Sequence, residues 1–124
     1  MGKVSKTIYH ADDDTLYLDL VHGILDPFHF VLTCYSGKHL LEQLECMLAD
    51  LIILDVEMPE MDGWETIKRL KANTATKNIP VIIFSGNNNF EDIKKGLSLG
   101  AVDYITKPCQ PDDLIDKVNS LLYV

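Results

Sequence analysis

Four segments of the sequence place side chains able to do chemistry directly after an apolar run. Two runs are followed by carboxylates, one by a hydroxyl and one by an ammonium group: Asp12, Asp13, Asp14, Asp55, Ser85 and Lys107. Like charges about 4 Å apart repel by roughly 1 kcal/mol in water and by more near a protein surface. The three consecutive carboxylates at 12–14 therefore need solvent, a helix N-terminus or a bound cation to offset their repulsion.

The residue types predict phosphoryl chemistry with a divalent cation. Carboxylate oxygens are typical ligands of a hard cation such as Mg²⁺. Asp55 follows four apolar residues, and a carboxylate can attack a phosphoryl group to form an acyl phosphate. Phosphoryl transfer depends mainly on positioning and charge neutralisation. Mg²⁺ and the point charge of Lys107 can neutralise two sides of the phosphoryl group, and Ser85 can donate a hydrogen bond to a third oxygen.

The elements that would position these side chains alternate along the chain. β-branched, aromatic and continuous apolar runs predict five strands, at 6–11, 29–35, 51–55, 79–85 and 102–106. Apolar residues at helical spacing predict five helices, at 15–25, 37–48, 63–73, 90–100 and 110–122. Tyr9 and His10 are unusual in a buried strand, which makes the first strand the least regular of the five.

This alternation predicts an α/β fold with one parallel sheet, right-handed crossovers and helices on both faces. In such a sheet, ligands bind outside the carboxyl ends of the strands. Because the reactive residues follow strands, we expect them to meet there, where a cation would offset the crowded charge. The second strand ends in no reactive side chain, which suits an edge strand. Asp14 is interpreted as a helix cap.

Composition narrows the classes of function. The chain has 124 residues, of which 47% are hydrophobic, as suits one domain with a sizeable core. A formal net charge of −8 disfavours direct binding to nucleic acid or anionic membranes. Three widely spaced cysteines without a CxxC pair predict a reduced, intracellular chain. No apolar run approaches the length of a signal peptide or a membrane span.

Taken together, the segments resemble the receiver domain of two-component response regulators along nearly the whole chain. Four motifs match in order, each at a strand end: "ADDD", "LIILDVEMPEMDGWE", "PVIIFSG" and "GAVDYITKP". The resemblance implies a flavodoxin-like (βα)5 fold, a doubly wound five-stranded parallel sheet in the order 2-1-3-4-5. The chain departs from the family pattern at positions to which the resemblance assigns no part in phosphorylation: Tyr9, His10, Thr15 and Cys109.

The resemblance also assigns roles to individual residues. Asp55 is implied to accept a phosphoryl group from a phosphohistidine. Asp13 is implied to bind Mg²⁺ directly, Asp12 mostly through water, and Glu57 through its backbone carbonyl. The remaining implied roles are phosphate pairing for Lys107, hydrogen bonding to the phosphate for Ser85, a rotamer switch for Tyr104, tuning of phosphate lifetime for Glu57 and Asn87, and a cis peptide bond at Lys107–Pro108.

The function implied is a cytoplasmic signalling switch more than a conventional enzyme, with Mg²⁺-dependent self-phosphorylation and dephosphorylation at Asp55. The implied partners are a sensor histidine kinase or a histidine phosphotransfer protein, and a downstream protein or output domain. The fourth helix, fifth strand and fifth helix would form the face that responds. Residues 1–124 are expected to form a single receiver domain, either alone or within a larger regulator, and a homodimer is open.

Three other functions could use a fold of this kind. A phosphorylation-independent adaptor with the same fold is the main alternative, although pseudo-receivers usually lack an acidic residue or the lysine that this chain retains. A phosphatase of the haloacid-dehalogenase type needs Asp and Thr where this chain has Glu57 and Pro59. Flavin binding needs a phosphate-binding loop where "DDDTL" would repel a phosphate.

Overall fold

A five-stranded parallel sheet forms the centre of the fold. The computed structural model describes residues 4–123, and each pair of neighbouring strands is parallel. The strand order is β2-β1-β3-β4-β5, which confirms the order implied by the resemblance and the edge position predicted for the second strand. The strands are β1 (Thr7–Ala11), β2 (Phe30–Cys34), β3 (Leu51–Leu54), β4 (Val81–Ser85) and β5 (Asp103–Thr106).

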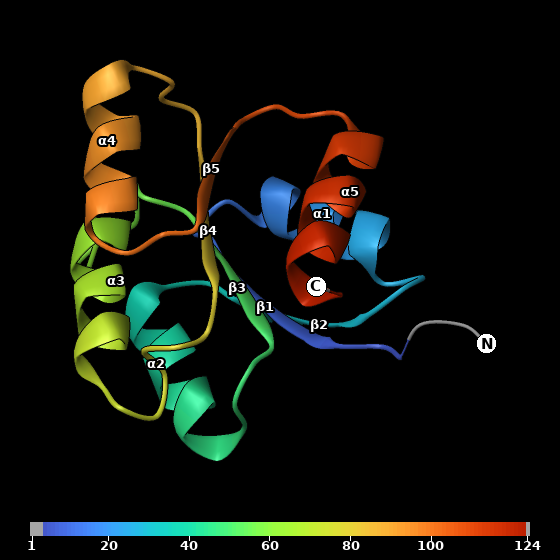
Figure 1. Ribbon diagram of the computed structural model, residues 1–124, viewed down its shortest axis with the longest axis horizontal. Helices are drawn as coiled ribbons and strands as arrows, with labels where there is room; N and C mark the ends of the chain where they lie inside the picture. The colour runs from blue at the N-terminus through green and yellow to red at the C-terminus, as the bar shows by residue number, and fades with distance from the viewer. Residues whose placement is uncertain (1–3, 124) are drawn as a thin grey trace.

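Helices cover both faces of this sheet. α1 and α5 lie on one face, and α2, α3 and α4 lie on the other (Figure 1). The helices are α1 (Thr15–Leu25), α2 (Gly37–Cys46), α3 (Gly63–Ala72), α4 (Phe90–Ser98) and α5 (Pro111–Leu122). Every predicted strand and helix is present, and each end lies within two residues of the predicted one. Across residues 4–123, no helix combines the length and apolar character that a membrane crossing requires.

The core consists of two apolar layers, one on each face of the sheet. β3 and β4 are buried along their whole length, as expected for central strands of a parallel sheet. Successive strand residues point to opposite faces. Ile8, Ile53 and Phe84 therefore pack with residues of α1 and α5, whereas Tyr9, Leu54 and neighbouring residues pack with α2 and α3.

The two unusual residues of β1 are both buried. Tyr9 is 1% exposed, and its hydroxyl donates a hydrogen bond of 2.6 Å to the carbonyl of Met47 at the end of α2. His10 is 0% exposed and points to the opposite face. The first strand is thus fully part of the sheet, and the polar end of Tyr9 is satisfied by a distant backbone carbonyl.

Side-chain caps fix the starts of most helices. In α1 the Asp14 carboxylate accepts a hydrogen bond of 3.0 Å from the Leu16 amide, which confirms Asp14 as a cap. The caps of α2, α3 and α4 are of the same kind, and are Ser36, Asp62 and Asn89. Such caps satisfy amide groups that have no partner within the helix. Each cap also fixes the residue at which the loop from the preceding strand ends and the helix begins.

Candidate functional site

Three acidic side chains meet at the carboxyl edge of the sheet. Asp12 and Asp13 follow β1, and Asp55 follows the neighbouring strand β3. One carboxylate oxygen from each lies within 4.8 Å of the others. They line an open cleft of about 650 Å³, whose walls are Asp12, Asp13, Asp14, Thr15, Tyr17, Asp55, Glu57, Gly86 and Lys107. The fold therefore brings together the predicted acidic residues and the predicted lysine.

Lys107, which follows β5, lies between two of the carboxylates. Its ammonium is 2.7 Å from Asp12 Oδ2 and 3.2 Å from Asp55 Oδ1. The same ammonium lies 4.2 Å from the ring centroid of Tyr17 and 5.4 Å from that of Phe84. Since the Lys107 side chain is 9% exposed, these carboxylates and ring faces make up much of its surroundings and hold its charge in place.

Burial and charge separate the pKa values of the two paired carboxyl groups. Burial, with the charge of Asp12, raises the pKa of Asp55 from 3.8 to about 6, although Lys107 opposes this rise. Burial also favours a higher pKa at Asp12, but the side chains of His10 and Lys107 and the Asp14 amide outweigh it and lower that pKa. Burial acts to lower the pKa of Lys107, yet the two carboxylates raise it. Asp12 and Lys107 thus form an ion pair in which both groups favour their charged forms. Asp55 lies beside this pair and takes up a proton at a higher pH than an ordinary aspartate.

The acidic cluster has the donors that a hard divalent cation requires. Asp12 and Asp55 are buried and Asp13 is exposed, so the cluster is fixed on one side and open to solvent on the other. All three donors are carboxylate oxygens, the ligand type that Mg²⁺ prefers. A cation there would offset the burial and the repulsion from Asp12 that together raise the pKa of Asp55. Glu57 lines the same cleft, and the role of its backbone carbonyl stays a prediction.

Ser85 and Tyr104 meet at the loop between β4 and α4. Ser85 is the last residue of β4 and is 2% exposed, and its hydroxyl accepts a hydrogen bond of 3.2 Å from the Asn87 amide. The Tyr104 hydroxyl on β5 donates a hydrogen bond of 2.5 Å to the Asn87 carbonyl. One backbone residue therefore links the predicted phosphate-binding hydroxyl to the predicted switch tyrosine.

The sequence pattern does not predict one residue of the site. It places Tyr17 in the first helix only, yet the Tyr17 ring contacts the ammonium of Lys107 and packs edge-on against Phe84 with centroids 5.7 Å apart. Its place one helical turn after the acidic run is the signal that could have indicated it. The Lys107–Pro108 peptide bond is cis, as the resemblance implied.

Comparison with known proteins agrees with this arrangement. Residues 8–119 match the response regulator receiver domain, so the chain belongs to that family. It is 39% identical over 116 residues to a probable cyclic di-GMP phosphodiesterase of Vibrio cholerae serotype O1, covering 94% of this chain and 26% of that protein. It is 39% identical over 106 residues to the two-component response regulator ORR5 of Oryza sativa subsp. japonica, covering 84% of this chain and 79% of that protein.

Solved structures share the fold over nearly the entire chain. A putative response regulator from Chloroflexus aurantiacus superposes with a TM-score of 0.92 at 28% identity, covering 98% of this chain and 100% of the other. The chain spans about a quarter of the Vibrio cholerae relative and about half of several other bacterial regulators. The shared part is the receiver domain of two-component response regulators.

Proposed function

We propose that this chain is a phosphorylation-dependent signalling switch in which Asp55 accepts a phosphoryl group in a Mg²⁺-dependent reaction. The donor would be a phosphohistidine on a sensor histidine kinase or on a histidine phosphotransfer protein. The observation that carries the proposal is the convergence of Asp55 with Asp12, Asp13 and Lys107 in one open cleft. The same site supports reaction with small phosphoryl donors.

The transfer would replace one bond to phosphorus by another. The phosphorus–nitrogen bond of the phosphohistidine breaks, a carboxylate oxygen of Asp55 bonds to phosphorus, and the imidazole leaves. Later attack by water would release inorganic phosphate and restore Asp55. Asp12, Asp13, Asp55 and the Glu57 carbonyl would hold Mg²⁺, which supplies positive charge to the phosphoryl oxygens. Lys107, now 3.2 Å from Asp55, would pair with another phosphoryl oxygen.

Ser85 and Tyr104 would carry the change away from the cleft. A Ser85 hydroxyl that turns toward a phosphoryl oxygen would give up its contact with the Asn87 amide, and Asn87 also accepts the Tyr104 hydroxyl. The face formed by α4, β5 and α5 would then change shape. Apolar side chains are exposed on or next to α4, namely Phe90, Leu97 and Val102. They suit contact with a downstream protein, an output domain or a second copy of the chain.

A protein donor must reach the mouth of the cleft. Leu16 and Leu20 on α1 are 76% and 49% exposed, and with Tyr17 and Pro108 they line a shallow apolar hollow of about 560 Å³. Tyr17 lines the cleft as well, so the two surfaces adjoin. We place the phosphoryl donor protein on this surface. We also propose no direct contact with nucleic acid, as the net charge of −8 favours. We further propose a cytoplasmic location, as the three cysteines without a CxxC pair suggest.

The test is direct phosphorylation with acetyl phosphate, with and without Mg²⁺, followed by intact mass. Asp55→Asn is the matched control, because it keeps the size of the side chain and removes the nucleophile. Fluorescence of Trp64 gives a second readout, since Lys95 of α4 lies 4.8 Å from its ring. We expect one phosphoryl group per chain in the presence of Mg²⁺ and none in the variant. No phosphorylation of the folded wild-type protein would favour the alternative, a phosphorylation-independent adaptor.

A further inference from the structure

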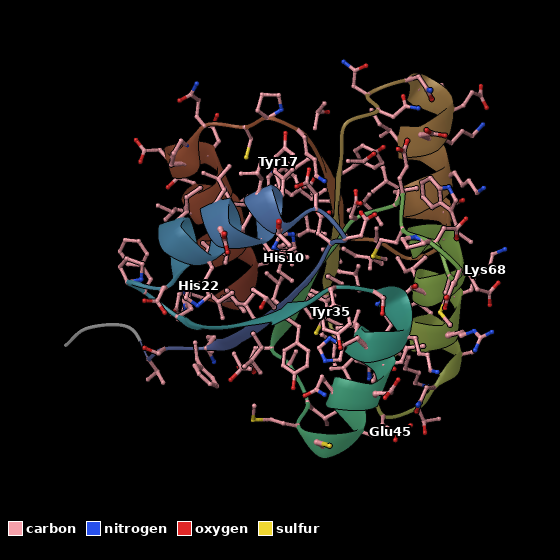
Figure 2. All side chains as sticks on the ribbon, turned by 180° about the vertical axis from the view of Figure 1, so that it is seen from behind. His10, Tyr17, His22, Tyr35, Glu45 and Lys68 are labelled. Atoms are coloured by element: carbon pink, nitrogen blue, oxygen red, sulfur yellow. The ribbon has the colours of Figure 1, made fainter. Side chains whose placement is uncertain are left out.

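His10 is a buried polar side chain beside the site, and the mechanism above gives it no role. It lies on β1 two residues before Asp12, and both side chains are 0% exposed. Among residues 4–123, neither ring nitrogen has a hydrogen-bond partner. The Asp12 carboxylate lies close by, with its Oδ2 3.7 Å from His10 Nε2. Figure 2 shows His10 under α1, on the side of the sheet that also carries Tyr17.

Packing alone does not account for a histidine at this position. The next β1 residue on the same face is Ile8, which is apolar and fully buried. A buried polar group without a partner costs free energy that an aliphatic side chain would avoid. The other unusual residue of this strand, Tyr9, does have its partner in the Met47 carbonyl. His10 therefore differs from its neighbours in keeping an unused donor next to a predicted metal ligand.

The present partners of Asp12 show where that donor could act. Asp12 Oδ1 accepts the Asp14 amide at 2.9 Å. Asp12 Oδ2 accepts the Lys107 ammonium at 2.7 Å and also faces His10. Lys107 is shared with Asp55, so a phosphoryl group on Asp55 competes for the same ammonium. When Lys107 turns to the phosphoryl group, Oδ2 loses its donor while the carboxylate stays buried.

We propose that His10 is a positioning residue that takes the place of Lys107 on Asp12 when Asp55 carries a phosphoryl group. The Nε2–H of the neutral imidazole would close the 3.7 Å gap to Oδ2 and hold the carboxylate toward the metal. The inference rests on the proposed function. Carboxylates that act at a metal site are themselves held by hydrogen bonds from an outer layer of residues, and loss of such a partner typically weakens metal affinity about 10–100-fold.

Three substitutions separate hydrogen bonding from packing. His10→Leu replaces the imidazole by an apolar side chain of similar size that has no hydrogen-bond donor. His10→Gln places an amide nitrogen near the position of Nε2, whereas His10→Asn places one near Nδ1, away from Oδ2. His39→Leu is the matched control, because His39 Nδ1 is also buried with no hydrogen-bond partner among the residues that the structure describes, while its ring stacks on Tyr35.

The readout is the Mg²⁺ dissociation constant by calorimetry, with and without beryllofluoride as the probe for a phosphorylated Asp55. With beryllofluoride, we expect His10→Leu and His10→Asn to lose roughly 10-fold in Mg²⁺ affinity. His10→Gln should recover most of the loss, and His39→Leu should match the wild type. Without beryllofluoride the loss should be much smaller, because Lys107 still holds Asp12. Thermal unfolding in EDTA should show His10→Leu at least as stable as the wild type.

Other results would overturn the inference. It fails if His10→Leu matches the wild type in both states, or if all three His10 variants lose affinity together with stability, which is a packing effect. Nitrogen-15 NMR of the wild type gives a test without substitution, since an Nε2 that carries no proton in the beryllofluoride state would contradict the inference. If the wild type binds neither Mg²⁺ nor beryllofluoride, the proposed function fails and the inference fails with it. Binding by the wild type with no effect at His10 refutes the inference alone.

Discussion

The ammonium of Lys107 lies 2.7 Å from the carboxylate of Asp12, although 95 residues separate them in the chain. The same ammonium contacts Asp55, which is 52 residues away. One cation thus links the ends of β1, β3 and β5, and it offsets the repulsion between two buried carboxylates. The lysine is therefore part of the stability of the fold as well as of the site.

Replacing Lys107 should destabilise the metal-free protein strongly. Lys107→Met leaves the buried carboxylates of Asp12 and Asp55 without their cation, and breaking a buried pair from one side typically costs about 3–5 kcal/mol. We expect a loss of about this size in the free energy of unfolding at pH 8 in EDTA. Because Mg²⁺ can replace the missing positive charge, it should stabilise the variant more than the wild type. Urea denaturation with and without Mg²⁺ measures both effects.

The control for this prediction is a second lysine ion pair on the surface. Lys117 lies 2.7 Å from Asp103, with side chains 42% and 33% exposed. Exposed pairs contribute about 0–1 kcal/mol, so Lys117→Met should change the free energy of unfolding by less than about 1 kcal/mol. Equal losses in Lys107→Met and Lys117→Met would contradict a special role for Lys107.

Asp55→Asn should stabilise the protein above neutral pH. The folded protein raises the pKa of Asp55 to about 6 from 3.8, so the folded state keeps this proton to a higher pH than the unfolded state. Stability linked to this group therefore falls as pH rises from about 4 to about 6, and the loss persists at higher pH. A rise of this size corresponds to about 3 kcal/mol at most. We expect Asp55→Asn to exceed the wild type by up to that amount at pH 8.

The difference between the two proteins is the quantity to follow. Urea denaturation in EDTA from pH 4 to pH 8 removes the contribution of metal, and the other carboxylates titrate in both proteins. The advantage of Asp55→Asn should shrink as pH falls through about 6 and nearly vanish near pH 4. If the difference in unfolding free energy between Asp55→Asn and the wild type did not change with pH, the fold would not raise the pKa of Asp55.

Tyr104→Phe should loosen the loop before α4. The Tyr104 hydroxyl donates a 2.5 Å hydrogen bond to the Asn87 carbonyl, and loss of one such bond costs about 1 kcal/mol. We expect faster amide hydrogen exchange between β4 and α4, with little change in β1 or α1. Tyr35→Phe is a suitable control, because Tyr35 is 64% exposed and lies on the far side of the sheet order from β5. If amide hydrogen exchange became faster throughout the protein in both variants, Tyr104 would have no local effect on this loop.

The positions of the acidic residues and of Lys107 could be predicted from the sequence because each follows a strand of a parallel sheet. The strand at 51–54 is buried on both faces, so its sequence is continuously apolar. The polar residue that follows it, Asp55, therefore stands out in the sequence. The position of Asp55 then follows from the pattern alone. That Asp12, Asp55 and Lys107 meet follows from topology, since the carboxyl ends of parallel strands share one edge of the sheet.

The rest depended on contacts between distant parts of the chain. The second helix was predicted to end at residue 48 but ends at Cys46, because Met47 is extended and its carbonyl accepts the hydroxyl of Tyr9. The fourth strand was predicted to begin at residue 79 but begins at Val81, just after a proline that has no amide hydrogen to donate. The spacing of Tyr17 from the acidic run indicates that it lies near the site, but its contact with Lys107 joins residues far apart in the chain and depends on the fold.

Gly63 should be intolerant of any side chain, because α3 begins directly against the backbone that carries Asp55, the proposed phosphorylation site. A Cβ at Gly63 would overlap the carbonyl oxygen of Asp55 and lie 2.7 Å from Cα of Val56. These are backbone atoms, and the Gly63 amide is also bound to the Val56 carbonyl at 2.8 Å. Neither α3 nor the end of β3 can therefore move away without breaking this contact. Overpacking of this kind costs about 1–3 kcal/mol or more.

We expect Gly63→Ala to lose about 1–3 kcal/mol or more of unfolding free energy and, where it folds, to be phosphorylated poorly because Asp55 is displaced. Gly23→Ala is the matched control, since a Cβ at Gly23 meets no atom within 4 Å. Gly23 lies inside α1, where alanine is favoured over glycine by about 0.5–1 kcal/mol. The same substitution should thus stabilise one helix and disrupt the other. Urea denaturation of both variants decides this, and a Gly63→Ala protein as stable as the wild type would refute the close contact behind Asp55.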